Sequence, residues 1–130
     1  MVKRHELRES VFKLLFQLEN SGMSLENIFN LDEEESYDAY VKDTVTLIYE
    51  NKENIDKIIS DSLKDWTIDR LSKMDRQILR IAIYEIVYSD IPYKVSINEA
   101  VELSKKYSEK DDSYKFVNGV LKGVVEREEK

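Results

Sequence analysis

Apolar residues recur at helical spacing along most of the chain. In the first such segment they fall three, four or seven residues apart, as on one face of an amphipathic helix. They are Leu7, Val11, Leu14, Leu15 and Leu18. Ser24 can cap a short helix through Asn30, and similar stripes predict longer helices over about 37–48, 55–63, from 96 and from about 112. No segment alternates apolar and polar residues for long enough to predict a strand.

The segment from Ile78 to Val87 has a different pattern, because its apolar residues lie on nearly every side of the expected helix. Such a helix is stable only when other helices surround it. We therefore expect a central helix near 74–88, which ends before Pro92 because proline disfavours a helical residue before it. The whole pattern predicts one all-α domain over 1–130, a compact bundle of about seven helices.

Two serines have the spacing of a capping box, in which a hydroxyl caps a helix and an acidic residue follows three positions later. Ser72 is followed by Asp75, and Ser96 by Glu99. The sequence therefore predicts helix starts at both serines.

Composition narrows the class of protein. The chain has no cysteine, which excludes a disulfide framework and permits a reducing, cytoplasmic environment. No apolar stretch follows the N-terminal residues for the length that a signal peptide or membrane span requires. The net charge of −7 argues against binding nucleic acid through the overall field, so any such site must be local.

The sequence contains no catalytic motif. His5 is the only histidine, and no second histidine at helical spacing could share a metal with it. There is no glycine-rich phosphate loop, so we expect no enzyme activity, metal or cofactor. Gly119 and Gly123, four residues apart in the last helix, favour the close approach of another helix.

Two local patterns are candidates for nucleic-acid binding. Cationic residues in the segment 3–8 could bond phosphate oxygens, although such a segment is more often a solvated helix face. Phe116 beside Lys115 could stack an unpaired base, although periodicity alone places Phe116 in the core. A second apolar row on the first helix, Phe12 and Phe16, widens its buried face and favours a partner.

Three segments resemble the NusB family. They read DRQILRIAIYEI at 75–86, IPYKVSINEAVELSKKY at 91–107 and DSYKFVNGVL at 112–121, and RESVFKLLFQLE near the N-terminus is similar to the family's first helix. Between about 21 and 64 only the helical pattern agrees. The resemblance implies two packed helical subdomains, roughly 1–64 and 65–130, and no catalytic activity.

The resemblance also implies a function. It points to an RNA-binding transcription antitermination factor that binds boxA RNA of nascent rRNA transcripts together with the small-subunit ribosomal protein NusE, in an RNA polymerase antitermination complex. Two other hypotheses stay open, a helical protein-interaction module without direct RNA binding and an accessory domain of an RNA methyltransferase. Both a monomer and a homodimer are compatible with the pattern.

By its match to the family's motifs, the resemblance assigns roles to particular residues. The RNA-binding residues it implies are Lys3, Arg4, His5, Arg8, Asp112, Lys115 and Phe116. The partner-binding residues it implies are Phe16, where we would expect a tyrosine, and Asp75. This assignment requires the first helix to begin beside the start of the last helix, and Phe116 to have a route to solvent.

Overall fold

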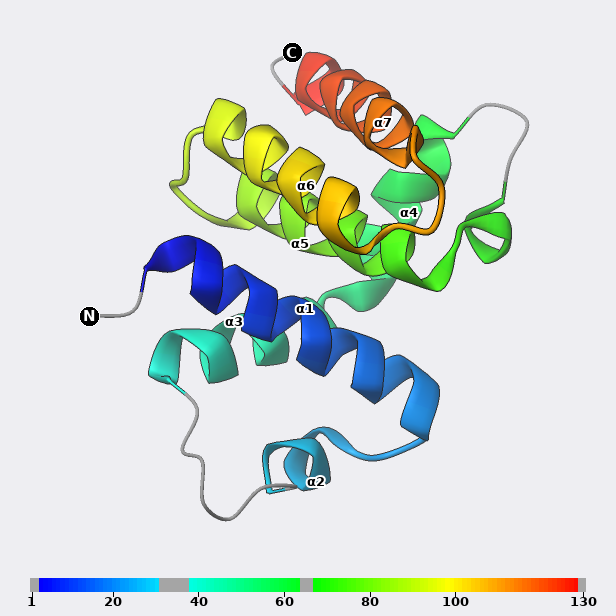
Figure 1. Cartoon of the computed structure of the whole chain (residues 1–130). Coiled ribbons are helices and arrows are strands. Elements are labelled where there is room, and N and C mark those ends of the chain that lie inside the picture. Colours follow the sequence, from blue (N-terminus) through cyan, green and yellow to red (C-terminus); the bar gives the residue numbers. More distant parts are fainter. Residues whose placement is uncertain (1–2, 31–37, 64–66, 129–130) are drawn as a thin grey trace.

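The computed structural model describes residues 3–30, 38–63 and 67–128 of the chain, and all its regular structure there is helical (Figure 1). The elements are α1 (Arg4–Ser21), α2 (Leu25–Phe29), α3 (Ala39–Glu50), α4 (Lys52–Ser62), the 3-10 turn η1 (Ile68–Arg70), α5 (Lys73–Tyr88), α6 (Tyr93–Tyr107) and α7 (Ser113–Glu128). The all-α prediction is confirmed. The division into two subdomains stays a prediction.

Helix α5 lies in the middle of the bundle, in contact with α1, α3, α4, α6 and α7 (Figure 1). Its residues from Gln77 to Glu85 are all buried, so no side of this part of the helix faces solvent. Each fully buried isoleucine or leucine stabilises the fold by about 1.5 to 3 kcal/mol. The prediction of a central apolar helix near 74–88 is confirmed.

Ion pairs join α1 and α4 to α5. Arg8 on α1 pairs with Glu85, and Glu19 near the other end of α1 pairs with Arg76. Arg80 holds Asp56 of α4 through two hydrogen bonds of 2.8 and 2.9 Å. Helix α1 is therefore fixed to α5 near both of its ends.

One of the two predicted helix starts is confirmed. The Ser72 hydroxyl accepts a hydrogen bond of 3.0 Å from the Asp75 amide at the start of α5. The prediction at Ser96 is wrong, because α6 begins three residues earlier, directly after Pro92. Proline has a fixed φ and no N–H to satisfy, which suits the first positions of a helix.

The glycines of α7 do not make the expected close packing. A Cβ added to Gly119 or Gly123 would meet no atom within 4 Å among the described residues, so the prediction of a closely approaching helix is wrong for this part of the chain. Among the described helices, none combines the length and apolarity that crossing a membrane requires.

Candidate functional site

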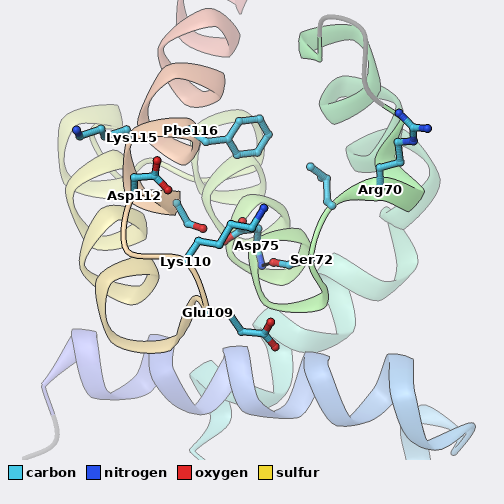
Figure 2. A pocket seen from close by; sticks show the side chains of 10 residues that line it. Arg70, Ser72, Asp75, Glu109, Lys110, Asp112, Lys115 and Phe116 are labelled. Atoms are coloured by element: carbon cyan, nitrogen blue, oxygen red, sulfur yellow. Dashed lines mark hydrogen bonds between the residues drawn. The ribbon is translucent and has the colours of Figure 1, made fainter.

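A pocket of about 430 Å³ opens between the start of α5 and the start of α7 (Figure 2). Its lining combines three cationic residues, three carboxylates and one aromatic ring. The residues are Arg70, Leu71, Ser72, Asp75, Glu109, Lys110, Asp112, Ser113, Lys115 and Phe116. A cavity with opposed charges beside a ring suits a ligand that has both a flat apolar face and a phosphate.

Phe116 is half-buried in this pocket. One part of the side chain packs against the hydrophobic core, and the ring also lines the cavity. Figure 2 shows the ring pointing from α7 toward the segment that carries Arg70, while Lys115 points away from it on the other side of α7. Phe116 is thus a core contact and also has a route to solvent, while its role in stacking a base stays a prediction.

Asp75 lies in the same pocket, although it is only 7% exposed. Its carboxylate accepts a hydrogen bond of 2.5 Å from the Ser108 hydroxyl, which links the start of α5 to the segment before α7. The expected partner contact at Asp75 and the expected RNA contacts at Asp112, Lys115 and Phe116 therefore meet in one cavity. Phe16, the other expected partner contact, is half-buried on α1 outside this lining.

The first residues of α1 present exposed cations. Lys3, Arg4 and His5 are all exposed. The Arg4 guanidinium lies 4.2 Å from the ring centroid of Tyr40, so α3 holds it by a cation–π contact. His5 points elsewhere, since it lines a hollow of about 330 Å³ against the last turns of α6.

Arg8 does not join these exposed residues, which corrects the sequence-based expectation. Its side chain is 4% exposed, and its Nε donates a hydrogen bond of 2.7 Å to Glu85. It also lies 3.5 Å from Glu99. Position 8 falls in the same helical row as Val11 and Leu15, and that row faces the core.

The last turn of α6 lies against α1. The Glu9 carboxylate accepts hydrogen bonds from Lys106, at 2.7 Å, and from the Tyr107 hydroxyl. These two donors outweigh the effect of burial and lower the pKa of Glu9. The Tyr107 ring packs 4.8 Å from Phe12, so the chain itself covers half of the second apolar row on α1.

The starts of α1 and α7 do not lie side by side, which corrects the expectation on which the residue assignment depended; α6 lies between them and connects them (Figure 1). Glu9 of α1 binds Lys106, while the neighbouring Lys105 reaches the ring of Tyr114 on α7 with its Nζ 5.0 Å from the centroid. Sequence reasoning missed Lys105, Lys106 and Tyr114 as members of this region. The paired lysines at the end of a predicted helix were the available signal.

Comparison with known proteins identifies the family. The model of the NusB family matches residues 5–126, which is nearly the whole chain. This chain belongs to the NusB family. Among curated NusB proteins, the transcription antitermination protein of Oceanobacillus iheyensis is 44% identical over 126 residues, covering 95% of this chain and 99% of that protein. The Staphylococcus aureus protein is 43% identical over 128 residues, with coverage of 95% and 98%.

Solved NusB structures share the fold. T. maritima NusB superposes with a TM-score of 0.84 at 40% identity, covering 96% of this chain and 92% of that one. A structure of the antitermination factors NusB and NusE in complex with dsRNA matches with a TM-score of 0.78 at 29% identity, covering 95% and 96%. Within the described residues of this NusB-family chain, no group of three or more His, Cys, Asp or Glu side chains is placed to hold a metal ion.

Proposed function

We propose that this chain is a transcription antitermination factor that binds boxA RNA of nascent rRNA transcripts together with NusE, within an RNA polymerase antitermination complex. One observation carries the proposal: the half-exposed ring of Phe116 faces a pocket that also holds Arg70 and Lys115, in a chain of the NusB family. The similarity to a NusB that was crystallised with NusE and dsRNA supports it.

The pocket has the groups that recognition of unpaired RNA needs. Phe116 offers a ring face on which a base can stack, and Lys115 and Arg70 can hold the phosphates on either side of it. The exposed carboxylate of Asp112 can accept a hydrogen bond from an amino group on a base edge. Stacking supplies affinity for any base, and the carboxylate adds selectivity.

The exposed cations at the start of α1 extend the RNA surface. Lys3, Arg4 and His5 are accessible to phosphate oxygens, whereas Arg8 is occupied by Glu85 and acts inside the fold. Since the chain as a whole carries a net charge of −7, this local surface attracts RNA while the remainder repels it.

Phe16 is the residue that we propose for contact with NusE. Its ring is half-buried on α1 and does not line the RNA pocket, so a protein can cover it while RNA is bound. Asp75, the other residue that we propose for this contact, lines the pocket at 7% exposure, and its bond to Ser108 also supports the shape of the pocket. Two weak RNA surfaces on NusE and this chain would then act together through their high effective concentration.

We propose that the chain acts by binding and does not catalyse a reaction, as its membership of the NusB family supports. We also propose a cytoplasmic location, since a factor acting on nascent bacterial transcripts works where they are made.

The decisive experiment measures the affinity of labelled boxA RNA by fluorescence anisotropy, with and without NusE. We expect Phe116→Ala to raise the Kd by roughly 5- to 150-fold, because losing a base–aromatic stack costs about 1 to 3 kcal/mol. Phe116→Leu keeps the packing of the side chain without the ring, so it separates stacking from stability. Tyr49→Ala, which removes an exposed ring on α3, is the control and leaves the Kd unchanged.

The affinity for boxA RNA is compared with the affinities for scrambled RNA and for duplex boxA. Equal affinity for boxA and scrambled RNA, in the presence and absence of NusE, would overturn the proposal. Binding to NusE without any RNA affinity at low salt would favour the protein-interaction module instead. RNA binding that NusE leaves unchanged would favour an accessory domain of an RNA methyltransferase.

A further inference from the structure

Two hollows border the proposed RNA surface, and they lie on different sides of the end of α6. The first, of about 330 Å³, is lined by His5 together with residues of α6. The second is the Phe116 pocket between α5 and α7. A single RNA strand that occupies both must cross the corner where α6 ends and α7 begins.

Three side chains at this corner link the two hollows. Lys105 lines the His5 hollow, and its Nζ lies 5.0 Å from the ring centroid of Tyr114. Lys115 lines the Phe116 pocket, and its Nζ lies 6.0 Å from the same centroid. The Tyr114 ring is therefore flanked by the ammonium groups of two residues, one from the lining of each hollow.

We propose that Lys105, Tyr114 and Lys115 form a bridge subsite that carries the RNA backbone from the His5 hollow to the Phe116 pocket. This inference rests on the proposed function. The two ammonium groups bind successive phosphates, because compact cations on flexible stems suit the non-directional contact that a moving backbone requires. Tyr114 keeps both cations at the corner through its ring.

Carboxylates also line the His5 hollow, so the attraction for the RNA backbone must come from Lys105 and Lys115 at the corner. Glu9, Glu99 and Glu102 line it. Each has a cation within 4 Å: Lys106 lies 2.7 Å from Glu9, Arg8 lies 3.5 Å from Glu99, and Lys105 lies 3.9 Å from Glu102. Of the three, Glu9 is matched by Lys106, whereas Glu99 shares Arg8 with Glu85, and Glu102 loses its contact when Lys105 binds a phosphate.

These distances also distinguish the two neighbouring lysines. Lys106 is held by a short hydrogen bond to Glu9. Lys105 has only a 3.9 Å contact with Glu102, and both side chains are more than half exposed, where such pairs are weak. A phosphate can therefore replace Glu102 at Lys105, so Lys105 is the RNA ligand and Lys106 holds α6 against α1.

The test measures the Kd of boxA RNA as a function of salt concentration for the wild type, Lys105→Ala and Lys122→Ala. Lys122 is an exposed lysine on α7 outside both hollows, so the two variants lose the same charge. We expect Lys105→Ala to weaken binding and to reduce the slope of log K against log salt by about 0.7, the value for one single-strand phosphate contact. Lys122→Ala keeps the wild-type slope.

Two further variants and a shorter RNA sharpen the result. Tyr114→Leu keeps every charge but removes the ring, and we expect it to lower the affinity in the same direction as Lys105→Ala. An RNA too short to leave the Phe116 pocket responds to Phe116→Ala but not to Lys105→Ala.

Each failure has its own signature. Wild-type protein that does not bind boxA would overturn the proposed function and the bridge together. Binding that is weakened by Phe116→Ala, with equal slopes for Lys105→Ala and Lys122→Ala, would overturn the bridge alone. Circular dichroism of each variant confirms that it is folded.

Discussion

Arg8 and Glu85 form the most deeply buried ion pair among the described residues, with side chains 4% and 1% exposed. Burial by itself would lower the pKa of Arg8, but the hydrogen bond and the charge of Glu85 outweigh it and raise the pKa. The Ser96 hydroxyl donates a second hydrogen bond to Glu85, at 2.8 Å. Three helices thus meet at one carboxylate, and Arg8 belongs to the interior of the protein.

Replacing Arg8 with Met tests this role. We expect the free energy of unfolding to fall by about 3 to 5 kcal/mol, because the charge of Glu85 would be left buried without its partner. The double variant Arg8→Met, Glu85→Leu recovers most of that loss, since neither charge is then buried. Urea unfolding measures both, with Lys3→Ala as an exposed control. If the Arg8→Met variant were as stable as the wild type but bound RNA more weakly, the interior role of Arg8 would be contradicted.

At the scale of elements, the fold depends on how α1 is attached to α5. Near its C-terminal end, Glu19 accepts hydrogen bonds from Arg76, at 2.6 Å, and from Gln77. Burial would raise the pKa of Glu19, but the bond from Arg76 and the charges of Arg80 and Arg76 outweigh it and lower the pKa. A lowered pKa means that the folded state favours the ionised carboxylate.

This attachment makes stability depend on pH. Because the folded-state pKa of Glu19 lies below its unfolded value of about 4.3, its contribution is complete above that value and is lost as the pH falls through the folded-state pKa. We expect Glu19→Gln to lower stability at pH 7 and to flatten the loss of stability below about pH 5. Urea unfolding at several pH values measures this. Glu50→Gln, on an exposed site of α3, is the control. If Glu19→Gln lost stability at low pH as steeply as the wild type, Glu19 would not be the group responsible.

At the scale of the whole molecule, cationic and acidic side chains are mixed around the two hollows of an acidic protein. His5 of α1, the two lysines at the end of α6 and Lys115 of α7 lie around the hollows, while the total charge is −7. Of the two rings in the second apolar row of α1, one is covered by the chain itself and the other is not. Tyr107 covers Phe12 internally, and Phe16 stays half-buried and accessible to another protein.

Phe16→Ala separates the partner surface from the RNA surface. We expect it to weaken binding of NusE by roughly tenfold or more, because aromatic side chains often dominate interface energies. The Kd for RNA without NusE stays at the wild-type value, since Phe16 does not line the RNA pocket. Isothermal titration calorimetry measures the first quantity and anisotropy the second, with Tyr49→Ala as an exposed-ring control. Unchanged affinity for NusE would remove Phe16 from the interface.

Helix positions could be predicted from the sequence because they depend on local periodicity. The rows of α1 and the all-round apolar pattern of α5 predict both helices and the central place of α5, since a helix repeats every 3.6 residues wherever it lies. The half-exposed aromatic residue beside a lysine at 115–116 was likewise visible as a candidate. The family resemblance then assigned it a role.

The positions of Arg8, Ser96 and Lys105 were decided only by the tertiary structure. Arg8 pairs with a carboxylate 77 positions away, and that same carboxylate draws Ser96 into the core in place of a helix cap. The corner of α6 and α7 brings Lys105 to Tyr114, and α6 lies between the starts of α1 and α7. Local spacing shows which face of a helix is apolar. Which neighbour covers a charged residue depends instead on how helices distant in the sequence pack together. This packing decides whether a cation is buried or free to bind RNA.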